Sequence, residues 1–255
     1  MMANLERQDD ILAILAKEKT ISVKKLAQVL YVSEATVRRD LTHMNNLGLL
    51  RRTHGGAMMA QDAAHESAFA MREVANIGAK KLICGLAIQQ LHNQDVVFMD
   101  SSSTMLPLIP LLQRFNRMSI VTHGIRTGLL LSNLENIEIF LAGGRVANFS
   151  NSILGSSVIN FYDQINADVS LLSSSGINLD GHITDNNIDH AMLKQKMINK
   201  SKRVILLIDH SKFDKTFMTS SFKLSDVDLV ITDKKPSLAY IELIKRAGCE
   251  LIYPQ

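Results

Sequence analysis

The stretch ISVKKLAQVLYVSEATVRRDLTHMNNLGLLRRTHGG, residues 21–56, decides the fold of the first part of this chain. Its apolar residues recur at helical spacing in two segments that a short connector separates, and a basic segment ending in two glycines follows the second. A short helix, a tight turn, a second helix and a basic hairpin in this order are typical of a winged helix-turn-helix. The sequence therefore predicts a domain that places its second helix in the major groove of DNA.

The second of these helices has a clear beginning and a clear buried face. Ser33 precedes the run EATVRRDLTHMNNL, and serine is a preferred residue at a helix N-cap. Val37, Leu41 and Met44 recur within it at helical spacing, which predicts the side that packs on the core. An amphipathic helix over residues 5–18 and a helix opened by the N-cap Ser22 supply the rest of the expected core.

The side of the second helix opposite to its buried face carries the residues expected to contact DNA. Arg39 lies two positions after Val37, about 200° around the helical wheel, so we expect it to face outward. Small and polar side chains in the first turn can approach base edges, and arginine can contact guanine at two points or hold a phosphate. With those of the wing, the residues expected to contact DNA are Ser33, Glu34, Ala35, Thr36, Arg38, Arg39, Arg51, Arg52 and His54.

The segment LGLLRRTHGGAMM after this helix predicts the wing. Leu49 and Leu50 can anchor a strand on the core, and the basic side chains that follow can lie along the phosphate backbone or the minor groove. Gly55 and Gly56 permit a tight reversal and a close approach of backbone.

Positive charge is concentrated in the same quarter of the chain. The 255 residues carry a formal net charge of +3, and residues 1–60 contain nine lysines and arginines against six acidic residues. Residues 61–255 contain nineteen of each kind, so their net charge is zero. Because affinity for nucleic acid begins with the neutralisation of phosphates, this distribution agrees with DNA binding by the first sixty residues.

Several classes of protein are disfavoured by what the sequence lacks. It has no apolar run of membrane-spanning length, and its beginning, MMANLERQDD, has no apolar core of a signal peptide. Its two cysteines, Cys84 and Cys249, have no metal-like spacing, so we expect two reduced, packed thiols in a cytoplasmic protein. No GxGxxG or P-loop pattern occurs, and we expect neither a cofactor nor a metal.

These N-terminal motifs resemble the DNA-binding domain of the DeoR family of bacterial transcriptional regulators. The matching pieces are ISVKKLAQVLYVSEATVRRDL and LLRRTHGGA, of which VSEATVRRDL is the most specific. The resemblance implies that residues 21–40 are the helix-turn-helix proper. We expect a DNA-binding domain over residues 1–59 and a linker over 60–75, since residues 57–75 lack strand character and run into a helix.

The remainder, residues 76–255, is expected to be a larger α/β domain. A helix over NIGAKKLICGLAIQQL should pack Ile77, Leu82, Ile83 and Leu86 inward. From residue 95, apolar runs alternate with helical segments, which predicts a doubly wound, mostly parallel sheet with helices on both faces. The expected strands are 96–100, 118–122, 137–144, 167–175, 203–211 and 228–233. The expected helices are 103–113, 124–133, 155–163, 187–200 and 237–247.

The ends of these strands are rich in hydroxyl groups and glycine. In such sheets ligands bind beyond the carboxyl ends of the strands, and hydroxyls at the start of a helix form a site of phosphate size. The composition of these strand ends predicts a polyhydroxylated, phosphorylated ligand. The residues expected to bind it are Asp100, Ser101, Ser102, Ser103, Thr104, Thr122, His123, Gly143, Gly144, Arg145, Ser175, Gly176 and Lys212.

The resemblance to the DeoR family extends over this second part. There the family's C-terminal domain is similar to sugar-phosphate isomerases such as ribose-5-phosphate isomerase and serves as an effector sensor. MDSSSTM stands in place of the phosphate loop, with Ser102 where the family has glycine, and VTHG carries His123 where asparagine is common. The segments LAGGR, SSSGINLDGHIT and LIDHSKF follow the family pattern, whereas His190 stands where an acidic residue is frequent.

We therefore expect a DNA-binding regulator, a repressor of carbohydrate-metabolism genes that a phosphorylated sugar releases from a double-stranded DNA operator. One helix-turn-helix reads only a few base pairs, so we expect a homo-oligomer, a dimer or a larger assembly. Activation instead of repression stays open, and the sequence identifies neither the effector nor the operator.

Two further functions remain alternatives. A sugar-phosphate isomerase with an added DNA-binding domain would use Asp180 and His182 of GINLDGHIT as acid and base groups. That loop faintly resembles amino-sugar-phosphate isomerases, but Thr184, Asp185 and Asn186 follow where the pattern has its catalytic glutamate, which favours a polar loop and no enzymatic activity. The second alternative is a nucleotide sensor, against which the 5% aromatic content and the absence of tryptophan count.

Overall fold

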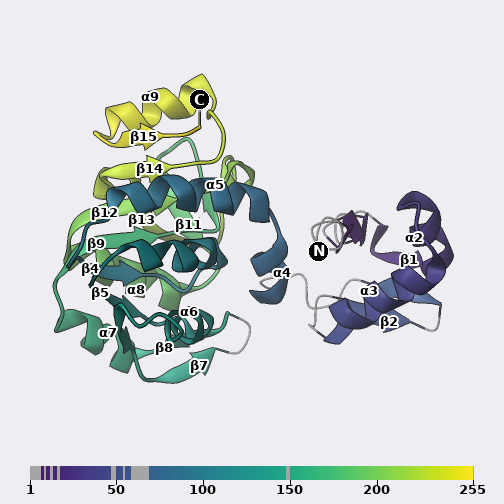
Figure 1. The fold of residues 1–255 in the computed structure, drawn as a ribbon. Coiled ribbons are helices and arrows are strands. Elements are labelled where there is room, and N and C mark those ends of the chain that lie inside the picture. The colour runs from purple at the N-terminus through teal and green to yellow at the C-terminus, as the bar shows by residue number, and fades with distance from the viewer. Residues whose placement is uncertain are drawn as a thin grey trace. The chain divides into compact units, whose positions relative to one another are not determined.

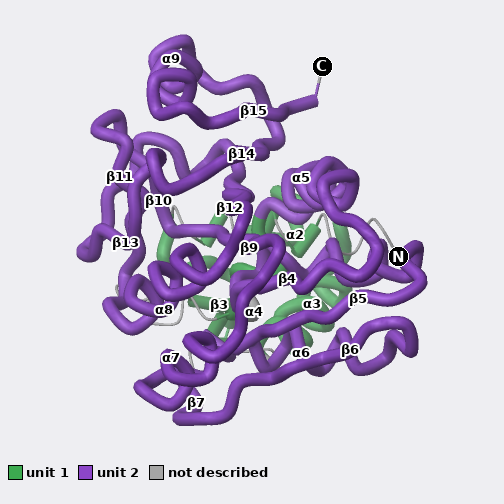
Figure 2. Tube along the Cα trace, turned by 90° about the vertical axis from the view of Figure 1, so that its left-hand side faces the viewer, with its two compact units in different colours: residues 1–75 green, residues 76–255 purple. Residues whose placement is uncertain are grey.

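The computed structural model describes residues 7, 8, 10, 11, 14, 15, 18–46, 50–53, 55–58, 69–147 and 150–254. The chain divides into two compact units, residues 1–75 and residues 76–255, which Figure 2 shows in different colours. The first unit has an apolar core of its own, and a separate core lies within the second. The two units are therefore described in turn.

The first unit combines helices with a small antiparallel sheet. The described residues between 7 and 18 are all helical, and α2 and α3 come later in this unit. β3 lies between β1 and β2, so that Ala57 faces Ile21 on one side and Arg52 on the other. The elements are β1 (Thr20–Ser22), α2 (Val23–Val29), α3 (Glu34–Asn46), β2 (Arg51–Thr53), β3 (Gly56–Met58) and α4 (Phe69–Val74).

The buried face and the beginning of α3 agree with the sequence. Val37, Leu41 and Met44 are fully buried. The Ser33 hydroxyl accepts a hydrogen bond from the Thr36 amide at 3.2 Å, and Ser22 accepts one from the Lys25 amide at 3.2 Å, so both predicted N-caps are confirmed. The rest of the core of this unit is Ile11, Leu15, Ile21, Val23, Leu26, Leu50 and Ala57.

An ion pair holds α3 against the helical segment that precedes β1. Arg7 donates from Nε to Asp40 Oδ2 at 2.6 Å and from Nη2 to Asp40 Oδ1 at 3.3 Å. Asp40 is buried on α3, and its hydrogen bond to the guanidinium raises the pKa of Arg7. A two-point contact of this kind fixes orientation as well as distance, so it sets the direction in which α3 presents its outer face.

The second unit is built on a seven-stranded parallel sheet in the order β15-β14-β12-β9-β4-β5-β6 (Figure 1). The chain enters the sheet at β4, proceeds outward through β5 and β6, and then returns to the other side of β4 with β9. The direction of winding therefore reverses between β4 and β9. The strands are β4 (Val96–Met99), β5 (Met118–Thr122), β6 (Ile137–Leu141), β9 (Ala167–Leu172), β12 (Ser201–Leu207), β14 (Leu229–Ile231) and β15 (Glu250–Ile252).

Helices cover both faces of this sheet, as the non-alternating strands predict. Phe98, Leu172 and Leu206 belong to one core cluster with side chains from α7, α8 and α9. Their neighbours Val97, Leu171 and Ile205 are equally buried but lie outside that cluster, and successive strand residues point to opposite faces. The helices are α5 (Ile77–Ala87), α6 (Ile125–Leu131), α7 (Ser156–Asp163), α8 (Ile188–Asn199) and α9 (Leu238–Arg246), with 3-10 helices η1 (Ile88–Gln90), η2 (Ser103–Arg114), η3 (His210–Lys212) and η4 (Leu224–Asp226).

Several boundaries differ from the sequence-based expectations. All six expected strands occur, but five of them end one to four residues earlier than expected, at residues 99, 141, 172, 207 and 231, where the chain passes into loops. The short edge strand β15 and two antiparallel additions were not expected, since none of these strands forms an apolar run of four or more residues. The additions are the hairpin of β7 (Arg145–Ala147) and β8 (Ser152–Leu154) and the sheet of β10 (Gly176–Ile177), β11 (His182–Asp185) and β13 (Thr219–Lys223).

Three further expectations were wrong in detail. Residues 57 and 58 were expected to lack strand character, but they belong to β3, where they pair with both β1 and β2. The helix after Ser102 is a 3-10 helix, and it contains Pro107 and Pro110, which cannot supply the amide hydrogen bonds of an α-helix. Leu82 of α5 is 52% exposed rather than buried, because Ile83, Cys84 and Ala87 form the inner face.

Both cysteines are free and buried in the second unit, as the sequence predicts. Burial raises the pKa of Cys84 to about 12 and that of Cys249 to about 11, so both thiols stay protonated near neutral pH. In the part of the chain that the structure describes, no helix has the length and apolar character needed to cross a bilayer.

The two glycines of the wing give a matched test of the fold of the first unit. A Cβ atom on Gly56 would collide with the carbonyl oxygen of Ile21 in β1, whereas none of the described atoms beyond its chain neighbours lies within 4 Å of such an atom on Gly55. Gly56→Ala should therefore speed amide exchange in β3 by about 10-fold or more in the full chain, which corresponds to a loss of about 1.4 kcal/mol in the free energy of opening this strand. Gly55→Ala should leave the exchange rates nearly unchanged, and equal effects of both changes would show that β1 does not pack as described.

Candidate functional site

The outer face of α3 is a continuous polar surface. Ala35, Arg38, Arg39, Thr42 and His43 occupy positions i, i+3, i+4, i+7 and i+8, which share one side of an α-helix. All five are exposed and line one shallow, open hollow. A small residue near the start of the helix, followed by two arginines, leaves room for the edges of bases and supplies donors for them.

The predicted DNA-contacting residues of α3 have different surroundings. Arg38 pairs with Glu34 one turn earlier at 3.3 Å. Arg39 forms no hydrogen bond or ion pair with any residue that the structure describes, so its guanidinium is available to a partner. The hydroxyls of Ser33 and Thr36 lie 2.9 Å apart, and Ser33 also caps the helix, so these two side chains first of all build the helix start.

The wing is tied to α3 by Arg52. Its guanidinium donates to Thr42 Oγ1 at 2.9 Å, and its backbone amide donates to Asn45 Oδ1 at 3.0 Å. These contacts hold the positive charge of β2 beside the polar face of α3. Arg51 is exposed in the same strand, whereas His54 lies outside the described residues.

In the second unit, a buried carboxylate joins the two strands at which the winding reverses. Asp100 directly follows β4, and its Oδ1 accepts the amide of Ser102 at 2.8 Å while its Oδ2 accepts the amide of Ser173, after β9, at 2.7 Å. Burial raises the pKa of Asp100, and the charge of Lys194 and these two amides oppose that rise. Since each oxygen accepts one backbone amide, Asp100 joins and shapes the two loops.

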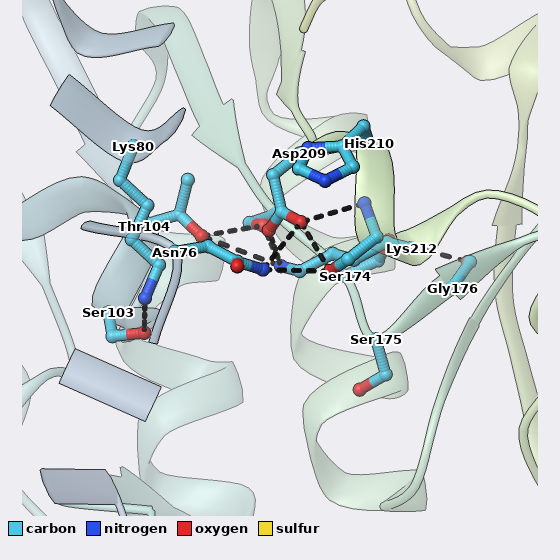
Figure 3. Close-up of polar contacts among 12 residues, drawn as sticks. Asn76, Lys80, Ser103, Thr104, Ser174, Ser175, Gly176, Asp209, His210 and Lys212 are labelled. Carbon is cyan, nitrogen blue, oxygen red and sulfur yellow. Dashed lines mark hydrogen bonds and ion pairs between the residues drawn. The ribbon is translucent and has the colours of Figure 1, made fainter. Parts of the chain in front are cut away.

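Lys212 gathers hydroxyl groups from both of these loops (Figure 3). Its Nζ donates to Ser173 Oγ at 3.0 Å and lies 3.5 Å from Thr104 Oγ1, while Ser173 Oγ donates to Thr104 Oγ1 at 3.2 Å. Asp209 lies 3.9 Å from the same ammonium group. Burial lowers the pKa of Lys212, whereas the Asp209 carboxylate raises it. One cation and several hydroxyls thus meet at the start of η2.

A second buried lysine lies beside this cluster. Lys80 projects from α5, and its ammonium donates to Ser103 Oγ at 3.1 Å (Figure 3). Ser103 and Thr104 form the first turn of η2, where backbone N–H groups have no partner within the helix. Two cations and a helix N-terminus therefore surround the loop that the sequence predicts as the anion site.

A buried ion pair supports the other side of the site. Lys194 of α8 donates to Asp185 Oδ2 at 2.6 Å, and Asp185 also accepts hydrogen bonds from the hydroxyls of Ser175 and Ser221. Burial alone would raise the pKa of Asp185, but Lys194 and Ser221 hold it below the usual value. The predicted effector residue Ser175 is thus engaged with Asp185, and Figure 3 shows its hydroxyl directed away from Lys212.

His123 is a buried neutral ring in this structure. Its Nδ1 lies 3.1 Å from the Tyr162 hydroxyl, and the ring centre lies 6.2 Å from that of His190. Burial, together with the charges of His190 and Lys194, lowers the pKa of His123 well below its usual range. A neutral imidazole at a strand end can donate or accept a hydrogen bond, but it adds no charge near neutral pH.

The other predicted effector residues lie in more peripheral or structural positions. Ser101 accepts a hydrogen bond from Ser152 at 2.7 Å, and Thr122 accepts one from the amide of Gly124 at 3.1 Å. Arg145 is exposed on β7 and pairs with Asp189 at 3.0 Å, so its charge is not directed at the hydroxyls around Lys212. Ser102 occupies the N-cap position of η2 without a capping hydrogen bond from its side chain, Gly143 and Gly144 are exposed before β7, and Gly176 packs tightly against the backbone of Lys215.

The residues proposed for the enzymatic alternative belong to a different surface. Asp180 is exposed in the turn between β10 and β11 and lines a hollow with Lys223 and Arg246. His182 Nδ1 lies 2.8 Å from the Ser220 hydroxyl on the neighbouring strand. This arrangement gives Asp180 and His182 no contact with the cluster around Lys212.

Sequence reasoning missed several residues of the strand-end cluster. Ser173 is the most central of them, and only its place near the end of the expected strand 167–175 could have indicated it. Lys80 and Lys194 lie on helices, where a lysine normally faces solvent, and no local pattern distinguishes a buried one. In the same way, nothing in the sequence shows that Asp185 is the partner of Lys194.

Comparisons with known proteins agree with this two-part organisation. A model described as the DeoR-like helix-turn-helix domain matches residues 7–63, and one described as the DeoR C terminal sensor domain matches residues 75–234. Ribose 5 phosphate isomerase A from Neisseria gonorrhoeae aligns with 12% identity over 52% of each chain and a TM-score of 0.39, values too low to support a conclusion about this protein.

Curated relatives align over nearly the whole chain. The transcriptional regulator GolR of Listeria innocua is 31% identical over 97% of each chain, and the transcriptional repressor GlcR of Bacillus subtilis is 33% identical over 97% of this chain and 95% of its own. The glycerol-3-phosphate regulon repressor of Escherichia coli is 27% identical over 95% and 96% of the two chains. The protein therefore belongs to the DeoR family and is a DNA-binding transcriptional regulator.

Proposed function

We propose that this protein represses genes of carbohydrate metabolism by binding an operator as a homo-oligomer, and that a phosphorylated sugar releases it. The observation that carries this proposal is the pairing of two surfaces in one chain. The first is the arginine-bearing outer face of α3 with its wing, and the second is the hydroxyl-rich, cationic cluster at the reversal point of the sheet. As a DNA-binding protein, it would act in the cytoplasm.

The first surface suits direct reading of DNA. Arg39 is unpaired among the described residues and can contact guanine at two points or a phosphate, while Ala35 permits a close approach to base edges. Arg51 and Arg52 would lie along the backbone beside α3. Because one such helix covers only a few base pairs, binding to a two-fold symmetric operator needs at least two copies of the chain.

The second surface suits a phosphate carrying a polyhydroxylated chain. The ammonium groups of Lys212 and Lys80 and the first turn of η2 would hold the phosphate, and the hydroxyls of Ser103, Thr104 and Ser173 offer further donors and acceptors. The neutral ring of His123 and the exposed Arg145 are further candidates for contacts to the sugar. A relative named as the repressor of a glycerol-3-phosphate regulon supports this class of effector.

Regulation requires that the effector distinguish two states of the protein. A ligand with equal affinity for the DNA-bound and the released arrangement would change nothing. A loss of DNA affinity of about 10-fold to 100-fold requires that the effector's binding free energies for the two states differ by about 1.4 to 3 kcal/mol. A few charge-assisted hydrogen bonds around Lys212 are sufficient to supply a difference of that size.

A thermal-shift screen against phosphorylated sugars tests the sensing half of the proposal. The panel contains hexose, pentose and triose phosphates, each beside the same sugar without its phosphate, and inorganic phosphate serves as a further control. A ligand of the folded state raises the melting temperature by mass action, so at least one phosphorylated member should raise it and its unphosphorylated partner should not. A flat response across the whole panel contradicts a sugar-phosphate effector.

Arg39→Ala should weaken binding to a duplex selected by the protein from a random pool by about 5-fold to 100-fold, because a lost two-point base contact costs about 1 to 3 kcal/mol. The melting temperature should not change, since Arg39 is exposed and unpaired among the described residues. Arg246→Ala, which removes the same charge from the exposed side of α9, is the matched control. Equal affinities of the Arg39 and Arg246 variants at one salt concentration would exclude the assigned role.

Lys212→Ala should leave DNA affinity in the absence of effector unchanged and raise the dissociation constant for the active sugar phosphate by about 10-fold to 100-fold, the effect of losing a charge-assisted hydrogen bond. Lys235→Ala removes an exposed lysine outside the strand-end cluster and serves as the control. Calorimetric titration measures both variants. Wild-type affinity in Lys212→Ala would remove this lysine from the binding site.

A further inference from the structure

We propose that Asn76 is the residue that couples occupation of the strand-end cluster to the linker that leads to the DNA-binding unit. This inference rests on the proposed function, because it assumes that an anionic effector binds beside Lys212. It adds the route by which that binding reaches the rest of the chain. Asn76 is the first residue of the second unit, so whatever moves Asn76 moves the end of the linker.

Asn76 contacts the loop that carries Lys212. Its side-chain amide Nδ2 donates to Ser211 Oγ at 3.0 Å and to Asp209 Oδ1 at 3.2 Å, across 133 positions of sequence in the second case (Figure 3). Ser211 and Lys212 are neighbours in η3, and Asp209 caps that short helix through the amide of Ser211. A shift of η3 therefore acts directly on the amide of Asn76.

The same side of α5 also contacts the loop after β4. Asn76, Lys80 and Cys84 are spaced four residues apart, so they lie in one row on the helix. The Lys80 ammonium donates to Ser103 Oγ at 3.1 Å, and the Cys84 thiol donates to the carbonyl oxygen of Thr104 at 3.1 Å. Asn76 and the first two turns of α5 thus contact both η3 and the loop after β4, which would hold the effector. Asn76 lies at the end nearest the linker.

Competition for Lys212 explains why the hydrogen bonds of Asn76 to Asp209 and Ser211 would respond to a bound phosphate. In the structure, Lys212 lies 3.9 Å from the Asp209 carboxylate that Asn76 also contacts. Burial raises the pKa of Asp209, but the opposite effect of Lys212, Ser211 and Lys80 is larger and holds this pKa below its usual value. The carboxylate is therefore charged and depends on these partners. A phosphate bound by Lys212 brings negative charge towards Asp209 and shares its cation. The loop, and with it Asn76, must adjust to that change.

The backbone at Asn76 makes the junction sensitive to such an adjustment. Its φ angle is 54°, in the left-handed region that asparagine tolerates better than most residues. The carbonyl oxygen of Asn76 accepts the first-turn amide of Lys80 at 3.0 Å, so Asn76 lies at the beginning of α5. The chain thus turns sharply between linker and helix at the residue whose side chain reaches the sensing loop.

Asn76→Gly is the sharpest test, because glycine accepts the left-handed backbone and removes the side chain that contacts η3. Gln94→Gly makes the same chemical change at another exposed position with positive φ, 71°, in the turn before β4. Two quantities are measured on the full-length chain: the affinity for the most effective sugar phosphate of the panel, and the affinity for the selected duplex with and without that sugar phosphate.

We expect Asn76→Gly to bind the sugar phosphate within about 3-fold of wild type, while the fold-change in DNA affinity caused by that ligand falls from about 10-fold or more towards one. Gln94→Gly should retain the full response. A role in folding alone would lower the melting temperature without changing the ratio of the two DNA affinities. Should Asn76→Gly not fold, Ser211→Ala removes one acceptor of the Asn76 amide and carries the same test, with a partial loss of response expected.

Two outcomes overturn the inference. The first is an unchanged response to the sugar phosphate in Asn76→Gly, which shows that the signal takes another route. The second is loss of ligand binding together with the response, which makes Asn76 part of the binding site. A failure of the proposed function looks different, because wild-type protein then shows no change in DNA affinity with any member of the panel. In that case no ligand-driven coupling exists, and the inference fails with it.

Discussion

The second unit depends on one carboxylate that is shared between two strands. Asp100 accepts amides from Ser102 on its own loop and from Ser173 on the loop after β9, and it does so where the winding of the sheet reverses. Burial makes the charged form of this group costly unless amides and a nearby cation stabilise it. The hydroxyls of Thr104 and Ser173, and through them Lys212, are therefore placed by the hydrogen bonds between Asp100 and the two loops.

A different constraint organises the first unit. The bidentate contact between Arg7 and Asp40 sets the orientation of α3, and the buried stripe of Val37, Leu41 and Met44 sets its rotation. Together they leave Arg39 on the outside. Arg52 then joins the wing to the same helix.

Local patterns were sufficient for much of this structure. The caps Ser22 and Ser33, the buried face of α3 and the six longer strands of the sheet follow from spacing and from hydrogen-bonding preferences that act within a few residues. The strands β7, β8, β10, β11, β13 and β15 were missed, because none of them forms an apolar run of four or more residues. Pro107 and Pro110 are visible in the sequence, yet their effect on the helix after Ser102 was not anticipated.

The sequence by itself determined that this chain has a basic helix-turn-helix followed by a parallel α/β unit, and that hydroxyls and Lys212 lie at strand ends. Only the tertiary structure decided which of these polar groups meet. Lys80, Ser103, Ser173 and Lys212 are far apart in sequence and become neighbours because β4, β9 and β12 are adjacent strands and α5 packs beside η2. Strand order is set by how apolar faces pack over the whole sheet, and no local pattern contains that information.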